Sequence, residues 1–231
     1  MQIGGLQKTT LIDYPGKIAA TVFLIGCNFR CPWCYSAELV LPEKIKTQPR
    51  VSQKEFFQFL KKRKGLLEGV VICGGEPTIN KDLPQFIRKI KKLGYLVKLD
   101  TNGSNSKMLK ELIDKKLIDY VAMDAKAPKE KYIKMVGKKI NVENIEKSIK
   151  ILKENKVDNE FRTTVVPTLL DKNDILKIAH WIKPAKKYFL QNFRPEKTID
   201  PSFERIKPYP QEYLLEIHNA IAPLFEICQI R

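Results

Sequence analysis

Short apolar runs alternate along the chain with longer stretches whose apolar residues recur every three or four positions. The runs are rich in β-branched and aromatic residues and end at turn formers, which predicts strands. They cover residues 21–25, 69–73, 95–100, 120–124, 161–166 and 188–193. The three- and four-residue spacing predicts helices. Ser52 and Glu55 form a capping box ahead of the helical stretch 56–64, and further helices are expected over residues 82–93, 106–116, 142–155, 172–182 and 210–222.

This order of elements predicts an α/β fold. Alternating strands and helices favour βαβ units, a parallel sheet and right-handed crossovers. The six predicted strand–helix units are too few for a closed eight-stranded barrel, so we expect a partial barrel or an open curved sheet. No linker divides the chain, and we therefore expect a single domain over residues 1–231.

Composition adds a strong positive charge to this picture. The formal net charge of +16 comes from 42 Lys and Arg against 26 Asp and Glu. Such a balance favours nucleic acid or an acidic protein surface as a partner. The basic residues are scattered, however, and only 61–64 and 88–92 form runs, so solvation of helix faces is the favoured explanation.

The same chain carries no sign of a membrane protein. Its longest apolar run, residues 18–26, is far shorter than the roughly 20 residues that a membrane span requires. Residues 1–17 contain no apolar region of the kind found in secretory signals. We therefore expect a cytoplasmic protein that has no membrane partner.

Polar and reactive residues follow each predicted strand at its end. The chemistry of parallel α/β proteins lies in the loops at the carboxyl ends of the strands. In chain order these loops begin with three cysteines (27–34), GGEP (74–77), DTNG (100–103), DAKAP (124–128), VVP (165–167) and QNFRP (191–195). One edge of the sheet is therefore predicted to gather thiolates, carboxylates, a lysine and an arginine.

The first of these loops has the spacing C-x₃-C-x₂-C at Cys27, Cys31 and Cys34. Thiolates favour zinc, copper(I) or iron–sulfur clusters. A structural zinc site would need a fourth ligand, and Cys73 at the end of the next strand is the nearest cysteine. Three thiolates fit a [4Fe–4S] cluster better, with one iron open to a substrate. A zinc site completed by Cys73 remains the alternative.

The remaining cysteines and the histidines are expected to be structural. Cys73 lies within a strand and is interpreted as a buried, inert thiol, and Cys228 is interpreted as a core residue. His180 and His218 both fall in helical patterns far from the cysteine loop. Phe29, Pro32 and Trp33 are expected to shield the cluster from water.

The cysteine spacing, with Trp33 before the third cysteine and GGEP at the end of the next strand, resembles the radical S-adenosylmethionine (SAM) enzymes. The resemblance covers nearly the whole chain and implies a partial (β/α)₆ barrel, a [4Fe–4S] cluster held by the three cysteines, and SAM. It also implies reductive cleavage of SAM to a 5′-deoxyadenosyl radical that abstracts hydrogen from a substrate. The cofactor carries this chemistry and the protein orients it.

The resemblance also implies how individual residues contact SAM. Gly74 and Gly75 would let the backbone come close, and Glu76 would accept a hydrogen bond from the amino group of the methionine part. Where related activases have a histidine near the adenine on the sixth strand, this chain has Gln191 and Asn192. The full set of expected SAM contacts is Trp33, Tyr35, Gly74, Gly75, Glu76, Asp100, Thr101, Asn102, Asp124, Lys126, Arg162 and Asn192.

Within this family the chain is most similar to the activating proteins of anaerobic ribonucleoside-triphosphate reductase and of pyruvate formate-lyase. Its opening GLQKTTLIDYPGK and its single cysteine cluster carry this resemblance. It implies that the hydrogen comes from a glycine of a partner glycyl-radical enzyme, with an electron donor such as flavodoxin or ferredoxin. Two alternatives remain open: a radical SAM enzyme that modifies RNA or tRNA, and a non-catalytic iron–sulfur or zinc protein.

Overall fold

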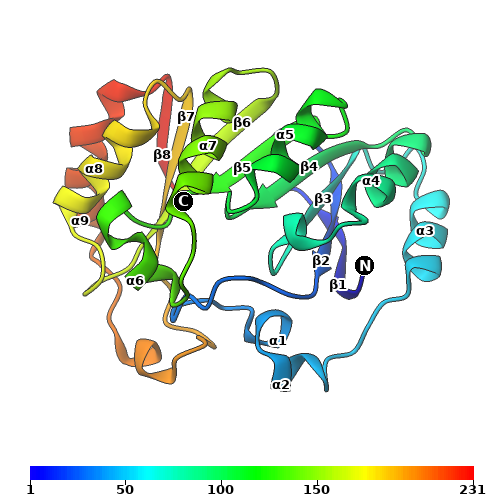
Figure 1. Cartoon of the computed structure of the whole chain (residues 1–231), viewed down its shortest axis with the longest axis horizontal. Helices are drawn as coiled ribbons and strands as arrows, with labels where there is room; N and C mark the ends of the chain where they lie inside the picture. Colours follow the sequence, from blue (N-terminus) through cyan, green and yellow to red (C-terminus); the bar gives the residue numbers. More distant parts are fainter. The chain divides into compact units, whose positions relative to one another are not determined.

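The computed structural model describes residues 1–231 and confirms the α/β class (Figure 1). Eight strands form one mostly parallel, open sheet in chain order, which confirms the expected partial barrel. The six predicted strands are all present: β2 (Ala19–Leu24), β3 (Gly69–Gly74), β4 (Leu96–Thr101), β5 (Tyr120–Asp124), β6 (Asp158–Val165) and β7 (Lys187–Asn192).

The six predicted helices are present as well. They are α3 (Gln53–Lys62), α4 (Leu83–Lys92), α5 (Ser106–Asp114), α7 (Val142–Lys153), α8 (Lys172–Ile182) and α9 (Gln211–Ile221). The capping box that begins α3 is confirmed, because Ser52 Oγ accepts a hydrogen bond from Glu55 N at 3.1 Å and Ser52 N donates to Glu55 Oε2 at 2.8 Å. The short helices α1 (Ala37–Val40), α2 (Pro42–Ile45) and α6 (Tyr132–Val136) were not predicted, since four or five residues show no periodicity.

Two further strands were not predicted from the sequence. β1 (Ile3–Thr10) pairs antiparallel with β2, and β8 (Ile227–Ile230) pairs in parallel with β7. β1 contains two glycines and three exposed residues in succession, so it lacks the alternation that marks a strand. β8 has only four residues, and none of them is fully buried.

The chain forms two compact units. The N-terminal unit comprises residues 1–28, 38–101 and 107–121, and the C-terminal unit comprises residues 29–37, 102–106 and 122–231. A single domain over residues 1–231 stays a prediction.

In the N-terminal unit, β1, β2, β3 and β4 are neighbours, and α3 and α4 pack together through Phe56 and Phe86. The rings of these two residues stack with their centroids 5.3 Å apart. β2 and β3 are almost wholly buried, as expected of parallel strands that are covered on both faces. Their register aligns Leu24 with Gly74, so the cysteine loop and GGEP leave the sheet at the same level.

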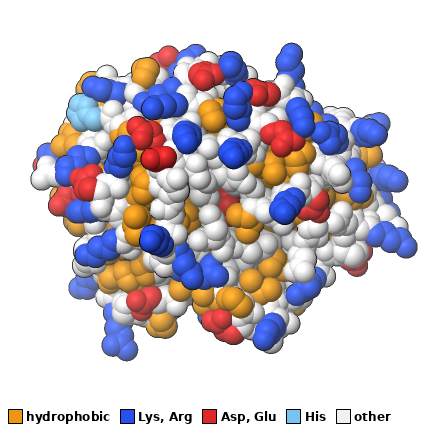
Figure 2. Space-filling model, viewed as in Figure 1, with side chains coloured by type: hydrophobic (Ala, Val, Ile, Leu, Met, Phe, Trp, Pro, Cys, Tyr) orange, Lys and Arg blue, Asp and Glu red, His pale blue; other side chains and the backbone are white.

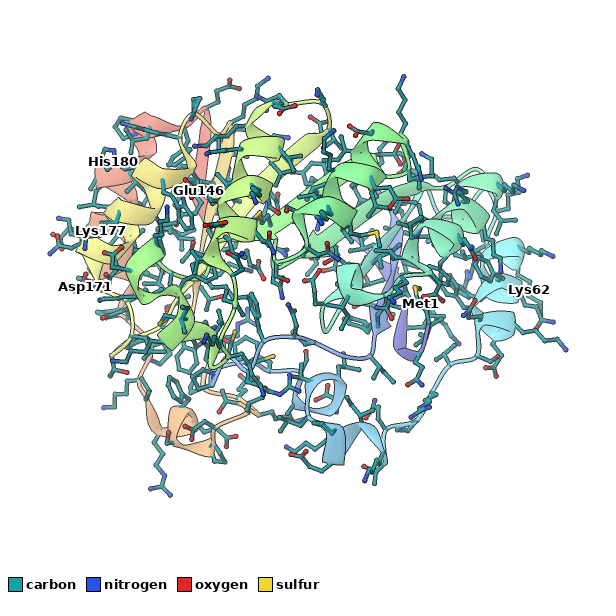
Figure 3. The ribbon with its side chains drawn as sticks, viewed as in Figure 1. Met1, Lys62, Glu146, Asp171, Lys177 and His180 are labelled. Carbon is teal, nitrogen blue, oxygen red and sulfur yellow. The ribbon has the colours of Figure 1, made fainter.

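In the C-terminal unit, β6, β7 and β8 run in parallel, and α8 and α9 lie beside them (Figure 1). His180 lies on the exposed side of α8 near Lys177 (Figure 3). His218 in α9 has a structural partner, because its Nε2 lies 3.0 Å from the carbonyl oxygen of Cys228. Cys228 itself is only half-buried, which corrects its interpretation as a core residue: β8 leaves one side of the thiol uncovered.

Positive charge predominates in this chain, and charges of both signs are interspersed on the face of the molecule that Figure 2 shows. Figure 2 shows Lys and Arg side chains interspersed with Asp and Glu, as the scattered lysines of the sequence suggest. Several of these lysines form exposed ion pairs one helical turn apart, such as Lys110 with Asp114 and Lys115 with Glu111. None of the helices is both long and apolar enough to span a membrane.

Candidate active site

The two glycines at the end of β3 let two loops approach each other closely. A Cβ on Gly74 would lie 2.3 Å from the backbone nitrogen of Leu24, and one on Gly75 would lie 1.9 Å from the carbonyl oxygen of Gly26. The peptide groups are joined there, since Gly75 N donates to Leu24 O at 2.8 Å and Glu76 N donates to Gly26 O at 2.7 Å. The glycines are therefore needed for packing against the loop that begins the cysteine motif, whatever they also contact.

Glu76 is buried, with 1% of its surface exposed, and its carboxylate is held by hydroxyl groups. Glu76 Oε1 accepts hydrogen bonds from Thr78 N at 3.0 Å, from Thr78 Oγ1, and from Thr101 Oγ1 at 2.7 Å. This brings GGEP and the DTNG segment together, as the sequence predicts. Thr78 was missed, because the residue that caps its turn is Glu76, and glutamate is not among the residues preferred at an N-cap.

Asp100 forms a second polar contact in the N-terminal unit. Its Oδ1 lies 2.5 Å from the ammonium nitrogen of Lys98, a side chain that is only 1% exposed. Lys98 was not among the predicted site residues, because a lysine in a strand is usually placed on the solvent side.

The later part of the cysteine loop lies in the C-terminal unit and is anchored by backbone hydrogen bonds. Arg30 N donates to Val136 O at 2.8 Å at the end of α6. Ile199 N and Asp200 N donate to the carbonyl oxygens of Cys34 and Pro32, both at 3.0 Å. Cys31 is buried and Cys34 is half-buried. The loop that carries these two thiols is thus bonded both to the end of α6 and to residues 199–200.

Aromatic residues surround this loop. Phe29 and Trp33, within the loop itself, are 2% and 5% exposed, and their shielding of a cluster stays a prediction. The hydroxyl of Tyr35 accepts a hydrogen bond from Arg194 N at 2.7 Å, and its ring stacks on Phe193. Burial raises the pKa of Tyr35, so the phenol remains neutral at physiological pH.

Asp124 and Lys126, at the end of β5, meet Arg162, which lies within β6. Lys126 Nζ and Arg162 Nε each lie 3.1 Å from a different oxygen of the Asp124 carboxylate. The side chains are 32%, 20% and 14% exposed respectively, so the trio faces solvent only in part. The structure therefore brings together three of the residues that the sequence predicted for the site.

The charges of this trio stabilise one another. Burial alone would raise the pKa of Asp124, but Lys126 and Arg162 outweigh it and hold that pKa below its ordinary value. Burial likewise would lower the pKa of Lys126, and the charges of Asp124 and Cys31 raise it instead. The thiol of Cys31 therefore lies within electrostatic reach of the Lys126 ammonium.

A buried support beneath the trio was missed in the sequence. The Tyr132 hydroxyl donates to Asp124 O and accepts from Lys126 N, both at 3.3 Å, and the ring is fully buried. Thr163 Oγ1 donates to Ala125 O at 2.6 Å, and Ala125 N donates to Arg162 O at 2.8 Å. These contacts fix the backbone between the aspartate and the lysine, and only the folded chain reveals them.

The two asparagines of the predicted site have different surroundings. Asn102 is buried, and its Oδ1 accepts a hydrogen bond from Ser104 N at 2.9 Å, so it shapes the turn before α5. Asn192, at the end of β7, donates from Nδ2 to Tyr209 O at 3.0 Å. Its Oδ1 is buried and has no hydrogen-bond donor, and the carbonyl of Tyr209 fixes this amide orientation.

The Asp124 trio predicts how stability depends on pH. Because the pKa of Asp124 is lowered on folding, its contribution is fully present above the ordinary aspartate value of about 3.9 and is lost as the pH falls through the lowered folded value. We expect Asp124→Asn to reduce the unfolding free energy at pH 7 by about 1 kcal/mol, a figure reduced for partial exposure. Below pH 4 the unfolding free energies of the two proteins, measured by urea denaturation, should converge.

The matched control is Asp114→Asn, which removes the carboxylate of an exposed ion pair with Lys110. It should leave stability almost unchanged between pH 7 and pH 3. If the unfolding free energies of Asp124→Asn and the parent protein differed by the same amount at every pH from 7 to 3, the assigned charge pairing would be contradicted.

The donor set of the cysteine loop fits an iron–sulfur cluster. It offers three thiols within eight residues, with Cys27 and Cys34 half-buried and Cys31 buried, and soft thiolates are the ligands of such clusters. No group of three or more His, Cys, Asp and Glu side chains is already arranged to hold a metal ion. The ligand roles of Cys27, Cys31 and Cys34 stay predictions.

The chain matches known proteins in sequence. The family model described as the radical SAM superfamily matches residues 21–182. A Methanocaldococcus jannaschii protein with the provisional name glycyl-radical enzyme activating enzyme is 37% identical over 226 residues, which cover 95% of this chain and 91% of the relative. A second protein of that organism with the same provisional name is 27% identical, over 93% of this chain and 84% of its own length.

Solved structures share the fold at low sequence identity. A domain of pyruvate-formate lyase-activating enzyme from Bacteroides vulgatus superimposes with a TM-score of 0.57 at 15% identity, covering 71% of this chain and 99% of that domain. Streptococcus suis SuiB bound to S-adenosylmethionine gives a TM-score of 0.67 at 14% identity over 91% of this chain. The chain spans about half the length of SuiB, 51%. By its sequence match over most of its length, the chain belongs to the radical SAM superfamily.

Proposed function

We propose that the protein is an activating enzyme that removes a hydrogen atom from a glycine residue of a partner glycyl-radical enzyme. The observation that carries this proposal is the 37% identity to a relative of that name over nearly the full length of both chains. A match of this extent includes the strand ends at which the chemistry of parallel α/β folds is located.

Radical SAM enzymes use a [4Fe–4S] cluster and SAM, which together supply the electron and the carbon radical for hydrogen abstraction. Cys27, Cys31 and Cys34 would hold the cluster as thiolates. The residues proposed to bind SAM are Trp33, Tyr35, Gly74, Gly75, Glu76, Asp100, Thr101, Asn102, Asp124, Lys126, Arg162 and Asn192.

The Asp124 trio is suited to the carboxylate of the methionine part. Two cations face one anion there, so the trio carries a net charge of +1 and can accept another carboxylate. Lysine offers a compact ammonium with three donors, which suits a carboxylate partner. Tyr132 keeps the lysine backbone fixed from below.

Asn192 is suited to the adenine end. Its Oδ1 is a buried acceptor that lacks a donor, and such an atom costs free energy until a donor reaches it. The exocyclic amino group of adenine is a donor of this kind. This would let an asparagine serve where related activases place a histidine.

The proposal also includes an electron donor, a cellular compartment and a segment of the partner enzyme. The electron donor would be a flavodoxin or a ferredoxin, and the reaction would take place in the cytoplasm. The glycine to be activated would lie in a backbone segment of the partner, which has to reach the 5′ carbon of the nucleoside.

The proposal is tested by mixing the anaerobically reconstituted protein, SAM and a reductant with a candidate glycyl-radical enzyme from the same organism. We expect the electron paramagnetic resonance doublet of a glycyl radical, and no doublet when the target glycine of the partner is replaced by alanine. Absence of a doublet, combined with tight and salt-dependent binding of tRNA, would instead favour the RNA-modifying alternative.

A further inference from the structure

Lys98 is a charged side chain enclosed in the N-terminal unit. It lies in the middle of β4 opposite Val71 of β3, and 1% of its side chain is exposed. A lysine is almost never fully buried without a partner, because the ammonium loses its hydration. Some group must therefore compensate for this charge.

The compensation comes mainly from one carboxylate. Asp100 Oδ1 lies 2.5 Å from Lys98 Nζ, and Lys98 has no second ion pair. The ammonium also lies 5.9 Å from the centre of the Tyr120 ring, within the range of a cation–π contact. Val71 and Tyr120 belong to one apolar cluster, so these neighbours give the ammonium an apolar setting.

The carboxylate is held at the end of the strand where the proposed site lies. Asp100 is two residues beyond Lys98 on the same face of β4, and 18% of its side chain remains exposed. The next residue, Thr101, binds the buried Glu76. A fixed cation thus lies behind Asp100, on the side away from solvent.

We propose that Lys98 is a positioning residue, which holds the carboxylate of Asp100 in one orientation for a hydrogen-bond donor of SAM. This inference rests on the proposed function, in which Asp100 contacts SAM. A buried ion pair adds little to stability compared with apolar residues of similar size, so stability alone is a weak reason for a lysine at this position. Residues that hydrogen-bond to metal ligands commonly contribute 10- to 100-fold in metal affinity or activity, and we expect an effect of this order for a residue that holds Asp100.

The test is SAM binding by isothermal titration calorimetry to the reconstituted, unreduced protein, with the thermal midpoint of the apoprotein as a second readout. We expect Lys98→Met to raise the dissociation constant of SAM about tenfold. In an Asp100→Asn background the same change should have no further effect, because Lys98 acts through Asp100. The control Lys91→Met removes a lysine paired with Asp119 at 2.7 Å on another part of the same unit and should leave binding unchanged.

Lys98→Arg separates positioning from packing. Arginine keeps the charge but overfills a buried space, so it should lower the thermal midpoint of the apoprotein more than methionine does while retaining most of the SAM affinity. Three results would overturn the inference. The dissociation constant of SAM could be unchanged in Lys98→Met, or the effects of Lys98→Met and Asp100→Asn on it could multiply in the double variant. The third is a Lys98→Arg protein that binds SAM no better than Lys98→Met. Failure of the proposed site would be seen separately, because Asp100→Asn would then bind SAM as tightly as the parent protein does.

Discussion

Replacing Cys31 with alanine is expected to abolish cluster assembly and, with it, SAM cleavage. Two thiolates would remain where three are required, and no other cysteine lies within the same loop. Cys31 is also the buried member of the set, so its loss would open the loop to water. Iron and sulfide analysis after anaerobic reconstitution measures the first effect, and release of methionine and 5′-deoxyadenosine measures the second.

The control for this substitution is Cys228→Ala. Cys228 lies in β8, and burial raises the pKa of its thiol to about 11, so it remains protonated and is a poor metal ligand at neutral pH. The variant should contain the same iron and sulfide as the parent protein. A Cys31→Ala protein with a full complement of iron would contradict the assignment of the three ligands.

Lys126→Met is expected to weaken SAM cleavage at subsaturating SAM by about a hundredfold. The substitution removes one of two cations from Asp124 and changes the net charge of the trio from +1 to zero. Truncating one partner of a partly buried, hydrogen-bonded charge pair typically costs about 2–5 kcal/mol in binding. The effect should appear mainly in the KM for SAM, measured by the initial rate of 5′-deoxyadenosine formation.

Lys129→Met is the matched control. Lys129 is three residues away and pairs with Glu146, which Figure 3 labels on α7, but its side chain is 56% exposed. An exposed pair of this kind contributes little, so the kinetic constants should stay within about twofold of the parent. If Lys126→Met and Lys129→Met lost activity equally, the loss would come from the lower net charge of the protein and not from the Asp124 trio.

The elements that position the site could be predicted because hydrophobic patterning and strand-end residues are local. β3, β5 and β7 each contain a run of three or four buried residues, and their ends carry residues with evident chemistry. β1 and β8 were missed because each depends on its pairing with a neighbour, β1 with β2 and β8 with β7. Pairing of that kind leaves no periodicity in the strand itself.

The supporting residues of the site could not be predicted for a related reason. Thr78, Lys98 and Tyr132 act through partners that only the folded chain brings near, and each residue type is common in unrelated surroundings. For Gly75, the sequence identified the residue but not the backbone group that it approaches. Its position in GGEP suggests room for a ligand, whereas the distances show that a side chain there would first meet the carbonyl of Gly26.

The central claim is that the hydrogen removed by this protein comes from a glycine of a protein partner. The most direct measurement uses a candidate glycyl-radical enzyme labelled with α-deuterated glycine, followed by mass spectrometry of the 5′-deoxyadenosine that is released. We expect deuterium in the 5′ position of that product, in proportion to the glycyl radical formed on the partner. Unlabelled 5′-deoxyadenosine formed at the same rate with and without the partner would contradict it.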